Sequence, residues 1–134
     1  MNNKSKLLQQ DIDELYQIVF DFLTDLADIF VLDVERGDLS IIELFYKRLH
    51  KDSVMQHTIN KLLPFSGQIK SRDINFFNQN KYIFAGLPND RVEYYGGLIT
   101  GGKRLSAEDL QNCWDYLDTM IALSTSYVNN AQRK

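Results

Sequence analysis

The feature that most constrains the fold is a regular apolar spacing near the start of the chain. Seven apolar residues follow one another at alternating intervals of four and three: Leu8, Ile12, Leu15, Val19, Phe22, Leu26 and Ile29. This spacing places one side of an α-helix against partner helices along its whole length. Ile18, Leu23 and Phe30 widen this side into the broader stripe typical of a helix in a bundle. The sequence predicts a first helix over residues 6–34, ended by Gly37.

A second regular spacing lies near the other end of the chain. The same intervals of four and three recur in Leu110, Trp114, Leu117, Ile121, Ser124 and Val128. Ser106 and Asp109 form a variant capping box, with Asp in place of the more usual Glu or Gln. We therefore predict a last helix over residues 107–130 that lies along the first helix and closes the bundle.

Shorter helical patterns occupy the middle of the chain. Apolar spacing predicts helices over about residues 38–50, 52–63 and 89–101, and residues 64–88 form an irregular, aromatic-rich connector. At 134 residues the chain has the usual size of one domain. The sequence thus predicts an all-α fold, a single domain over residues 1–134 built as a bundle of five to six helices.

Composition narrows the classes of function. The net charge is −3, so the chain lacks the basic surface that neutralises phosphates, and we expect no direct nucleic-acid contact. The longest apolar runs, such as residues 29–32, are far shorter than the ~20 residues that span a bilayer, so we expect no membrane insertion. The single Cys113 cannot form an internal disulfide, and no N-terminal segment is typical of a signal peptide. These features favour a reducing intracellular compartment.

One glycine-rich stretch imitates a phosphate-binding loop. Residues 97–103 fit the spacing G-x-x-x-x-G-K, but Arg104 stands where the loop needs a Ser or Thr to hold magnesium. The motif also needs a preceding strand, whereas residues 92–99 show helical spacing. We interpret the stretch as a glycine-terminated helix followed by a basic turn.

Other candidate chemical groups are isolated from one another. Asp21, Asp25 and Asp28 share one side of the first helix, which favours a solvated acidic face over a site for a hard cation or a basic partner. His50 and His57 lack metal-ligand spacing, and Cys113 lies on a strongly apolar helix. We therefore expect no catalytic residue, cofactor, metal site or small-molecule substrate, and no enzymatic activity.

Aromatic residues gather in the connector and just after it. One interpretation is a lid that plugs an end of the bundle, and the other is a protein-binding patch, since Tyr, Phe and Arg are enriched at interface centres. The two are compatible. Ile74 and Phe77 share a helical side and are expected to be buried. The candidate residues for contact with a protein partner or a second copy are Phe76, Tyr82, Tyr94, Arg91 and Arg104.

Two segments together resemble a known group of proteins. They read IKSRDINFFNQNKYIFAGLPNDRVEYYGGLI and LSAEDLQNCWDYLDTMIALSTSY, and the resemblance covers about residues 60–128. It is carried by Arg72-Asp73, Phe76-Phe77, Ile83-Phe84, and the Trp114-Asp115-Tyr116 helix with its Ala122. The group comprises small helical proteins of unknown function from nucleocytoplasmic large DNA viruses, the giant viruses. The resemblance implies a viral origin and a place in the host cytoplasm or the virion, and it implies no activity.

Two hypotheses of function follow. The first is a non-enzymatic viral interaction or structural protein that presents a protein-binding surface, alone or as a homodimer. The second is an accessory subunit of viral transcription or genome-handling machinery, reached through other proteins. Capture of capsid or membrane proteins would favour the first, and capture of polymerase or histone-like proteins the second.

Overall fold

The computed structural model describes residues 3–132, and within these it contains helices and no strand. The elements follow in the order α1 (Asn3–Ile29), α2 (Asp33–Arg48), α3 (Lys51–Lys61), the 3-10 helix η1 (Leu63–Phe65), α4 (Ser66–Lys70), α5 (Phe76–Gln79), α6 (Asn89–Thr100) and α7 (Ala107–Ala131). The all-α prediction is confirmed.

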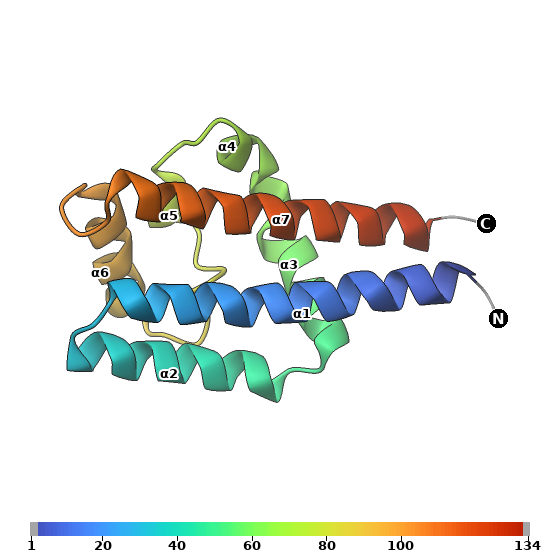
Figure 1. Cartoon of the computed structure of the whole chain (residues 1–134), viewed down its shortest axis with the longest axis horizontal. Helices are drawn as coiled ribbons and strands as arrows, with labels where there is room; N and C mark the ends of the chain where they lie inside the picture. Colours follow the sequence, from blue (N-terminus) through green and yellow to red (C-terminus); the bar gives the residue numbers. More distant parts are fainter. Residues whose placement is uncertain (1–2, 133–134) are drawn as a thin grey trace.

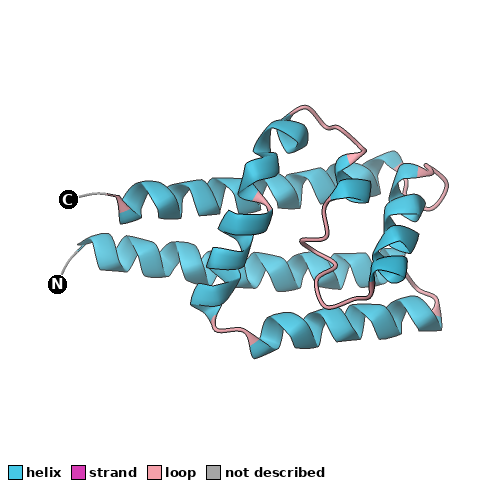
Figure 2. Cartoon of the chain, turned by 180° about the vertical axis from the view of Figure 1, so that it is seen from behind, coloured by secondary structure: helices cyan, strands magenta, loops and turns pink. Residues whose placement is uncertain are grey.

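The helices form two layers. Figure 1 shows α1 and α7 antiparallel and side by side along the long axis, with α2 packed along the other side of α1. The view from behind shows α3 and α6 crossing the long helices on the far side, joined by the connector (Figure 2). The prediction that the long first and last helices pack together is therefore confirmed.

The apolar seam predicted for the first helix forms the centre of the core. Leu15 and Val19 have no exposed surface, and the Phe22 ring stacks on Tyr116 of α7 with ring centres 4.8 Å apart. At the start of α7 the Ser106 Oγ accepts a hydrogen bond from the Asp109 backbone N–H, and the Asp109 carboxylate accepts one from the Ser106 N–H. The predicted capping box is present, and α7 runs one residue beyond the predicted end.

The predicted boundary between the first two helices is wrong. Instead of a helix over residues 6–34 ended by Gly37, α1 ends at Ile29, α2 begins at Asp33, and Gly37 lies inside α2. The chain reverses at Leu32, whose backbone is extended and whose N–H donates to Glu35 Oε1 at 3.3 Å. This turn contains no glycine or proline. It is held instead by the burial of Phe30 in the core and by the Glu35 carboxylate, which caps the start of α2.

The connector over residues 64–88 contains α4, which was not predicted, and α5, near which the sequence predicted a helical side with Ile74 and Phe77. A bend between these helices places Arg72 at a backbone φ of 57°. Its guanidinium donates two hydrogen bonds to the Asp118 carboxylate of α7, at 2.8 and 2.5 Å, and one to the Ile69 carbonyl. These contacts fix the connector to α7.

None of the helices in the described residues has both the length and the apolar composition needed to cross a membrane.

Candidate protein-binding surface

Two of the five candidate contact residues lie in the core rather than on the surface. Phe76 is 3% exposed and Tyr82 is 2% exposed, so the expectation that they face a partner is wrong. Phe76 is enclosed because α5 is a single turn inserted between η1 and α7, where its ring packs against Phe65 and Trp114. Asn78 and Gln79 form the exposed side of this helix, so the neighbouring residues Phe76 and Phe77 are both buried on its inner side.

Tyr82 is buried by a polar arrangement that the sequence did not reveal. Its hydroxyl lies 2.6 Å from the Thr58 hydroxyl, and its ring stacks on His57 with centres 5.1 Å apart. The Tyr46 hydroxyl in turn donates to the Tyr82 carbonyl oxygen. Burial raises the pKa of the Tyr82 phenol far above its ordinary value. The side chain is therefore uncharged where it packs against α2 and α3.

The other three candidates meet at two acidic side chains of α2. Glu35 has no exposed surface, and its carboxylate accepts a hydrogen bond from the Tyr94 hydroxyl at 2.6 Å. Arg104, from the loop between α6 and α7, donates to the other oxygen of the same carboxylate. Burial by itself would raise the pKa of Glu35, but the hydrogen bonds from Tyr94, Arg104 and the Leu32 N–H, with the Arg104 charge, hold it below its ordinary value of 4.5.

Asp38, one turn further along α2, forms the second half of the network. Its Oδ2 accepts from Arg91 Nε at 3.0 Å, from Arg91 Nη2 at 2.7 Å and from the Tyr95 hydroxyl at 2.6 Å. The Arg91 guanidinium also lies 4.4 Å from the centre of the Tyr94 ring. The network binds α6 and the loop that follows it to α2, so these charges are satisfied within the chain. Whether Arg91, Tyr94 and Arg104 also contact another protein stays a prediction.

Glu35 and Asp38 were missed because the second helix was predicted to start only at residue 38. They occupy α2 together with the buried Leu39, Ile42 and Tyr46. Burying a carboxylate costs free energy unless it is paired with a positive charge. The helical spacing of Glu35 and Asp38 with these buried apolar residues was therefore the one sequence pattern that could have indicated a buried ion pair.

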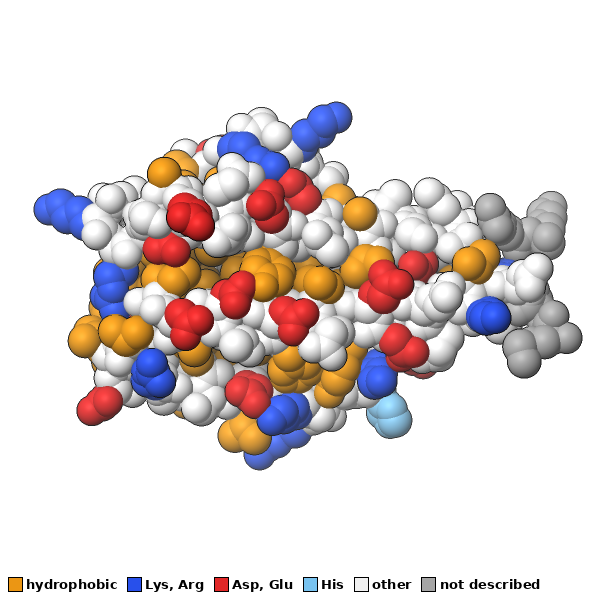
Figure 3. Space-filling view, viewed as in Figure 1, with side chains coloured by type: hydrophobic (Ala, Val, Ile, Leu, Met, Phe, Trp, Pro, Cys, Tyr) orange, Lys and Arg blue, Asp and Glu red, His pale blue; other side chains and the backbone are white. Residues whose placement is uncertain are grey.

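The outer side of α2 and the turn before it carry exposed apolar side chains. In the part of the chain that the structure describes, the exposed large hydrophobic residues are Val31, Leu32, Val34, Ile41 and Leu44, each about half exposed. We call this set the 31–44 face. Figure 3 shows hydrophobic side chains at the surface where α1 joins α2 and along the lower edge of the molecule. Exposed apolar side chains that share one stretch of the surface are candidates for contact with another protein.

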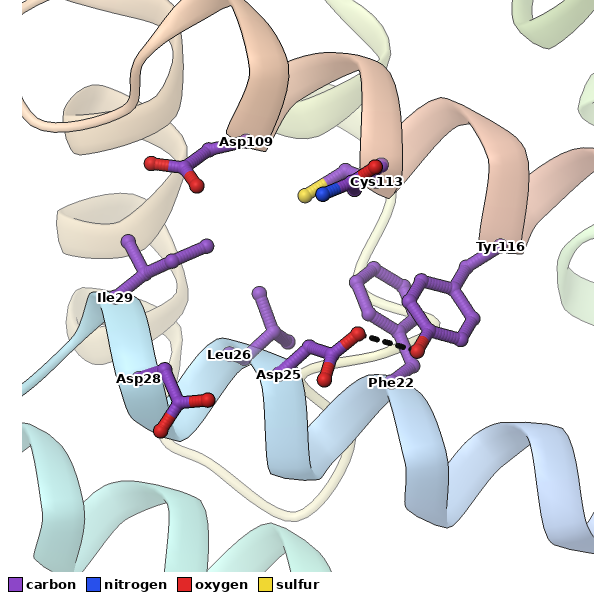
Figure 4. A pocket seen from close by; sticks show the side chains of 9 residues that line it. Phe22, Asp25, Leu26, Asp28, Ile29, Asp109, Cys113 and Tyr116 are labelled. Carbon is purple, nitrogen blue, oxygen red and sulfur yellow. Dashed lines mark hydrogen bonds between the residues drawn. The ribbon is translucent and has the colours of Figure 1, made fainter.

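A pocket of about 280 Å³ lies between α1 and α7. Figure 4 shows Asp25 and Asp28 on its α1 side, Asp109, Cys113 and Tyr116 on its α7 side, and the hydrogen bond that Tyr116 donates to Asp25. Burial, with the nearby charges of Asp109 and Asp25, raises the pKa of the Cys113 thiol to about 12. The thiol is therefore protonated at neutral pH and is a poor nucleophile. Over residues 3–132, no three His, Cys, Asp or Glu side chains are grouped to hold a metal ion.

A larger cavity, of about 570 Å³, lies between α3 and residues 79–89. Its lining includes Phe65, Phe84 and Leu87 together with His57, whose Nε2 has no hydrogen-bond partner among residues 3–132. Burial lowers the pKa of His57, so this ring is neutral at pH 7. The cavity presents no pair of groups in the arrangement of a nucleophile and its base among the residues that line it.

The glycine-rich stretch does not have the geometry of a phosphate-binding loop. Residues 97–100 form the last turn of α6, and Lys103 is exposed in the loop that follows. No strand precedes the stretch in residues 3–132, so the arrangement that aims backbone N–H groups at a phosphate is missing there.

Comparisons of the chain with protein-family models, with curated proteins and with solved structures find no match.

Proposed function

We propose that this protein is a non-enzymatic binding protein and that its contact surface is the 31–44 face. The observation that carries the proposal is that, within residues 3–132, the exposed large hydrophobic residues are confined to this one stretch. Half of each of these side chains stays in contact with water, and covering them by another protein removes that apolar surface.

The neighbouring network supports the choice of this surface. Asp38 follows Val34 by four residues and precedes Ile41 by three, so its ion pair with Arg91 lies directly beside the apolar side chains. An apolar centre bordered by arginine and tyrosine is the composition enriched at protein interfaces. Arg91 and Tyr94 are thereby retained as border residues of the surface, while Phe76 and Tyr82 are not part of it.

The viral origin remains part of the proposal, supported by the resemblance over about residues 60–128. With it we propose residence in the host cytoplasm or the virion and a structural or adaptor role among viral proteins. Direct contact with nucleic acid has no support in the composition, because the net charge is −3.

The test uses the full chain with an affinity tag in infected cells. The variant Ile41→Asp/Leu44→Asp places two charges within the 31–44 face, and Thr125→Asp places one on an exposed position of α7 as a control. We expect the double variant to lose the proteins that the wild type captures and the control to keep them. Unchanged capture by the double variant, with its helical content retained, would refute the proposed surface. Capture of polymerase or histone-like proteins rather than capsid or membrane proteins would identify the accessory-subunit role.

A further inference from the structure

The outer side of α2 carries the spacing of a helix that packs on another helix. Its positions are Val34, Gly37, Ile41, Leu44 and Arg48, which alternate at intervals of three and four, and we call them the α2 seam. Val34 is 56% exposed, Ile41 48% and Leu44 51%, so no element among residues 3–132 covers the seam. Alternation of three and four is the pattern that lets two helices interlock along their length.

We propose that a second copy of this chain occupies the α2 seam, with the two α2 helices antiparallel. This inference rests on the proposed function and identifies its partner. In this arrangement Val34 faces Leu44 of the second copy, and Ile41 faces Gly37 of the second copy. Each pair occurs twice about a twofold axis, so one surface serves both copies.

Gly37 gives the contact its shape. A Cβ atom added at Gly37 would meet nothing within 4 Å, so the helix surface there is open. In the antiparallel pair the Ile41 side chain of the second copy packs over this open position, as a knob enters a hole. The seam is therefore complementary to itself, with its large apolar side chains opposed either by one another or by the glycine.

The charges along the seam determine the direction of the second helix. Asp33 precedes Val34 and Lys47 precedes Arg48, so both lie on the same flank of the seam, and both are exposed. In the antiparallel pair Asp33 of each copy approaches Lys47 of the other. In a parallel pair this flank of one helix and the same flank of the other lie on opposite sides of the contact, so Asp33 and Lys47 would not meet.

Two further features agree with the antiparallel direction. Lys47 Nζ lies 2.6 Å from Glu43 Oε1 of its own helix, and both side chains remain about half exposed, so the ammonium is still accessible to a second carboxylate. Antiparallel helices also place the positive end of each helix dipole beside the negative end of the other. Charge pairs of this kind fix the register and direction of a contact more than its strength.

Sedimentation of the full chain over a range of concentrations tests the inference. We expect the mass to move from one chain toward two as concentration rises. Ile41→Asp should raise the dissociation constant by at least about tenfold, since it places a charge in a desolvated apolar contact. Thr125→Asp, on an exposed position of α7, should leave the dissociation constant unchanged.

Charge reversal tests the direction. Asp33→Lys and Lys47→Asp should each weaken association, because each brings like charges together across the contact. The variant that carries both changes should recover wild-type association, because the opposite charges meet again. Helical content measured by circular dichroism for each variant separates loss of association from loss of fold.

Three outcomes would overturn the inference. A wild type that stays monomeric to millimolar concentration rules out the second copy, and if Ile41→Asp/Leu44→Asp still loses a captured protein, the proposed function survives. A dimer that Ile41→Asp leaves intact places self-association on another surface. A dimer that Ile41→Asp disrupts, but in which the combined charge reversal fails to restore association, rules out the antiparallel direction.

Discussion

Two adjacent glycines of α6 make a matched pair for testing how the connector packs. Gly96 is buried, and a Cβ added there would lie 2.7 Å from Asn78 Oδ1 and 2.9 Å from the Phe77 carbonyl oxygen. Gly97 is exposed, and a Cβ added there would meet nothing within 4 Å. Replacing glycine with alanine stabilises the helix by about the same free energy at both positions. Any difference in stability between the two substitutions therefore comes from packing against α5.

The opposing contributions give the size of the effect. In a helix interior alanine is favoured over glycine by about 1 kcal/mol, so we expect Gly97→Ala to raise the free energy of unfolding by about 0.5–1 kcal/mol. At Gly96 the same gain is opposed by overpacking, which costs about 1–3 kcal/mol. The Phe77 carbonyl is backbone and moves only if α5 moves, so we place Gly96→Ala at the upper end, with a net loss of about 1–2 kcal/mol.

Urea denaturation measures both variants. Trp114 is the single tryptophan, and its ring centre lies 4.9 Å from that of Phe77, so its fluorescence reports on the same region. A further comparison in an Asn78→Ala background removes the side-chain obstacle and leaves the carbonyl, and we expect Gly96→Ala to remain destabilising there. A Gly96→Ala protein as stable as Gly97→Ala would refute the close approach of α5 and α6.

Three other predictions concern the core, the buried carboxylate and the glycine-rich loop. Phe22→Ala and Trp114→Ala should each lower the free energy of unfolding by about 3–5 kcal/mol, and losses below about 1 kcal/mol in both would contradict the packing of α1 on α7. Because the folded-state pKa of Glu35 lies below its ordinary value of 4.5, its contribution to stability is present above that pH and is lost as the pH falls through the folded-state pKa. Glu35→Gln should therefore lose less stability than the wild type in denaturation series between about pH 6 and about pH 3, and an equal loss would exclude this contribution. Calorimetric titration with magnesium and ATP or GTP should show no binding centred on Lys103, and micromolar affinity that Lys103→Ala abolishes would prove us wrong.

The long helices could be predicted because their information is local and repeated. Each apolar position of α1 and α7 lies one helical turn from the next, and many turns agree on the same side of the helix. Ser106 and Asp109 mark the start of α7 within four residues of sequence. Local, redundant patterns of this kind need no knowledge of what packs against them.

The turn between α1 and α2 and the fate of the connector depend on contacts between distant residues. Asp38 meets Arg91 across 53 positions of sequence, and Glu35 meets Arg104 across 69. Phe76 is buried because η1 and α7 cover it, and neither is adjacent to it in sequence. The exposed side of α5 is formed by Asn78 and Gln79, and the sequence alone did not indicate that Phe76 lies away from it.

The polar contacts on the inner side of α2 account for the exposed apolar side chains on its outer side. Tyr46 and the carboxylates of Glu35 and Asp38 take specific hydrogen-bond partners on the inner side, and such directional contacts fix the rotation of the helix, as apolar packing alone does not. Rotating α2 to bury Ile41 and Leu44 would pull both carboxylates from their arginine and tyrosine partners, at the cost of several charge-assisted hydrogen bonds of about 1.5–3 kcal/mol each. Half-exposed Val, Ile and Leu side chains regain less than that on burial, about half of the 1.5–3 kcal/mol for complete burial of each. The buried charges thus keep the α2 seam at the surface, and because neither the helix nor another element of residues 3–132 covers it, the apolar side chains remain available to a second chain.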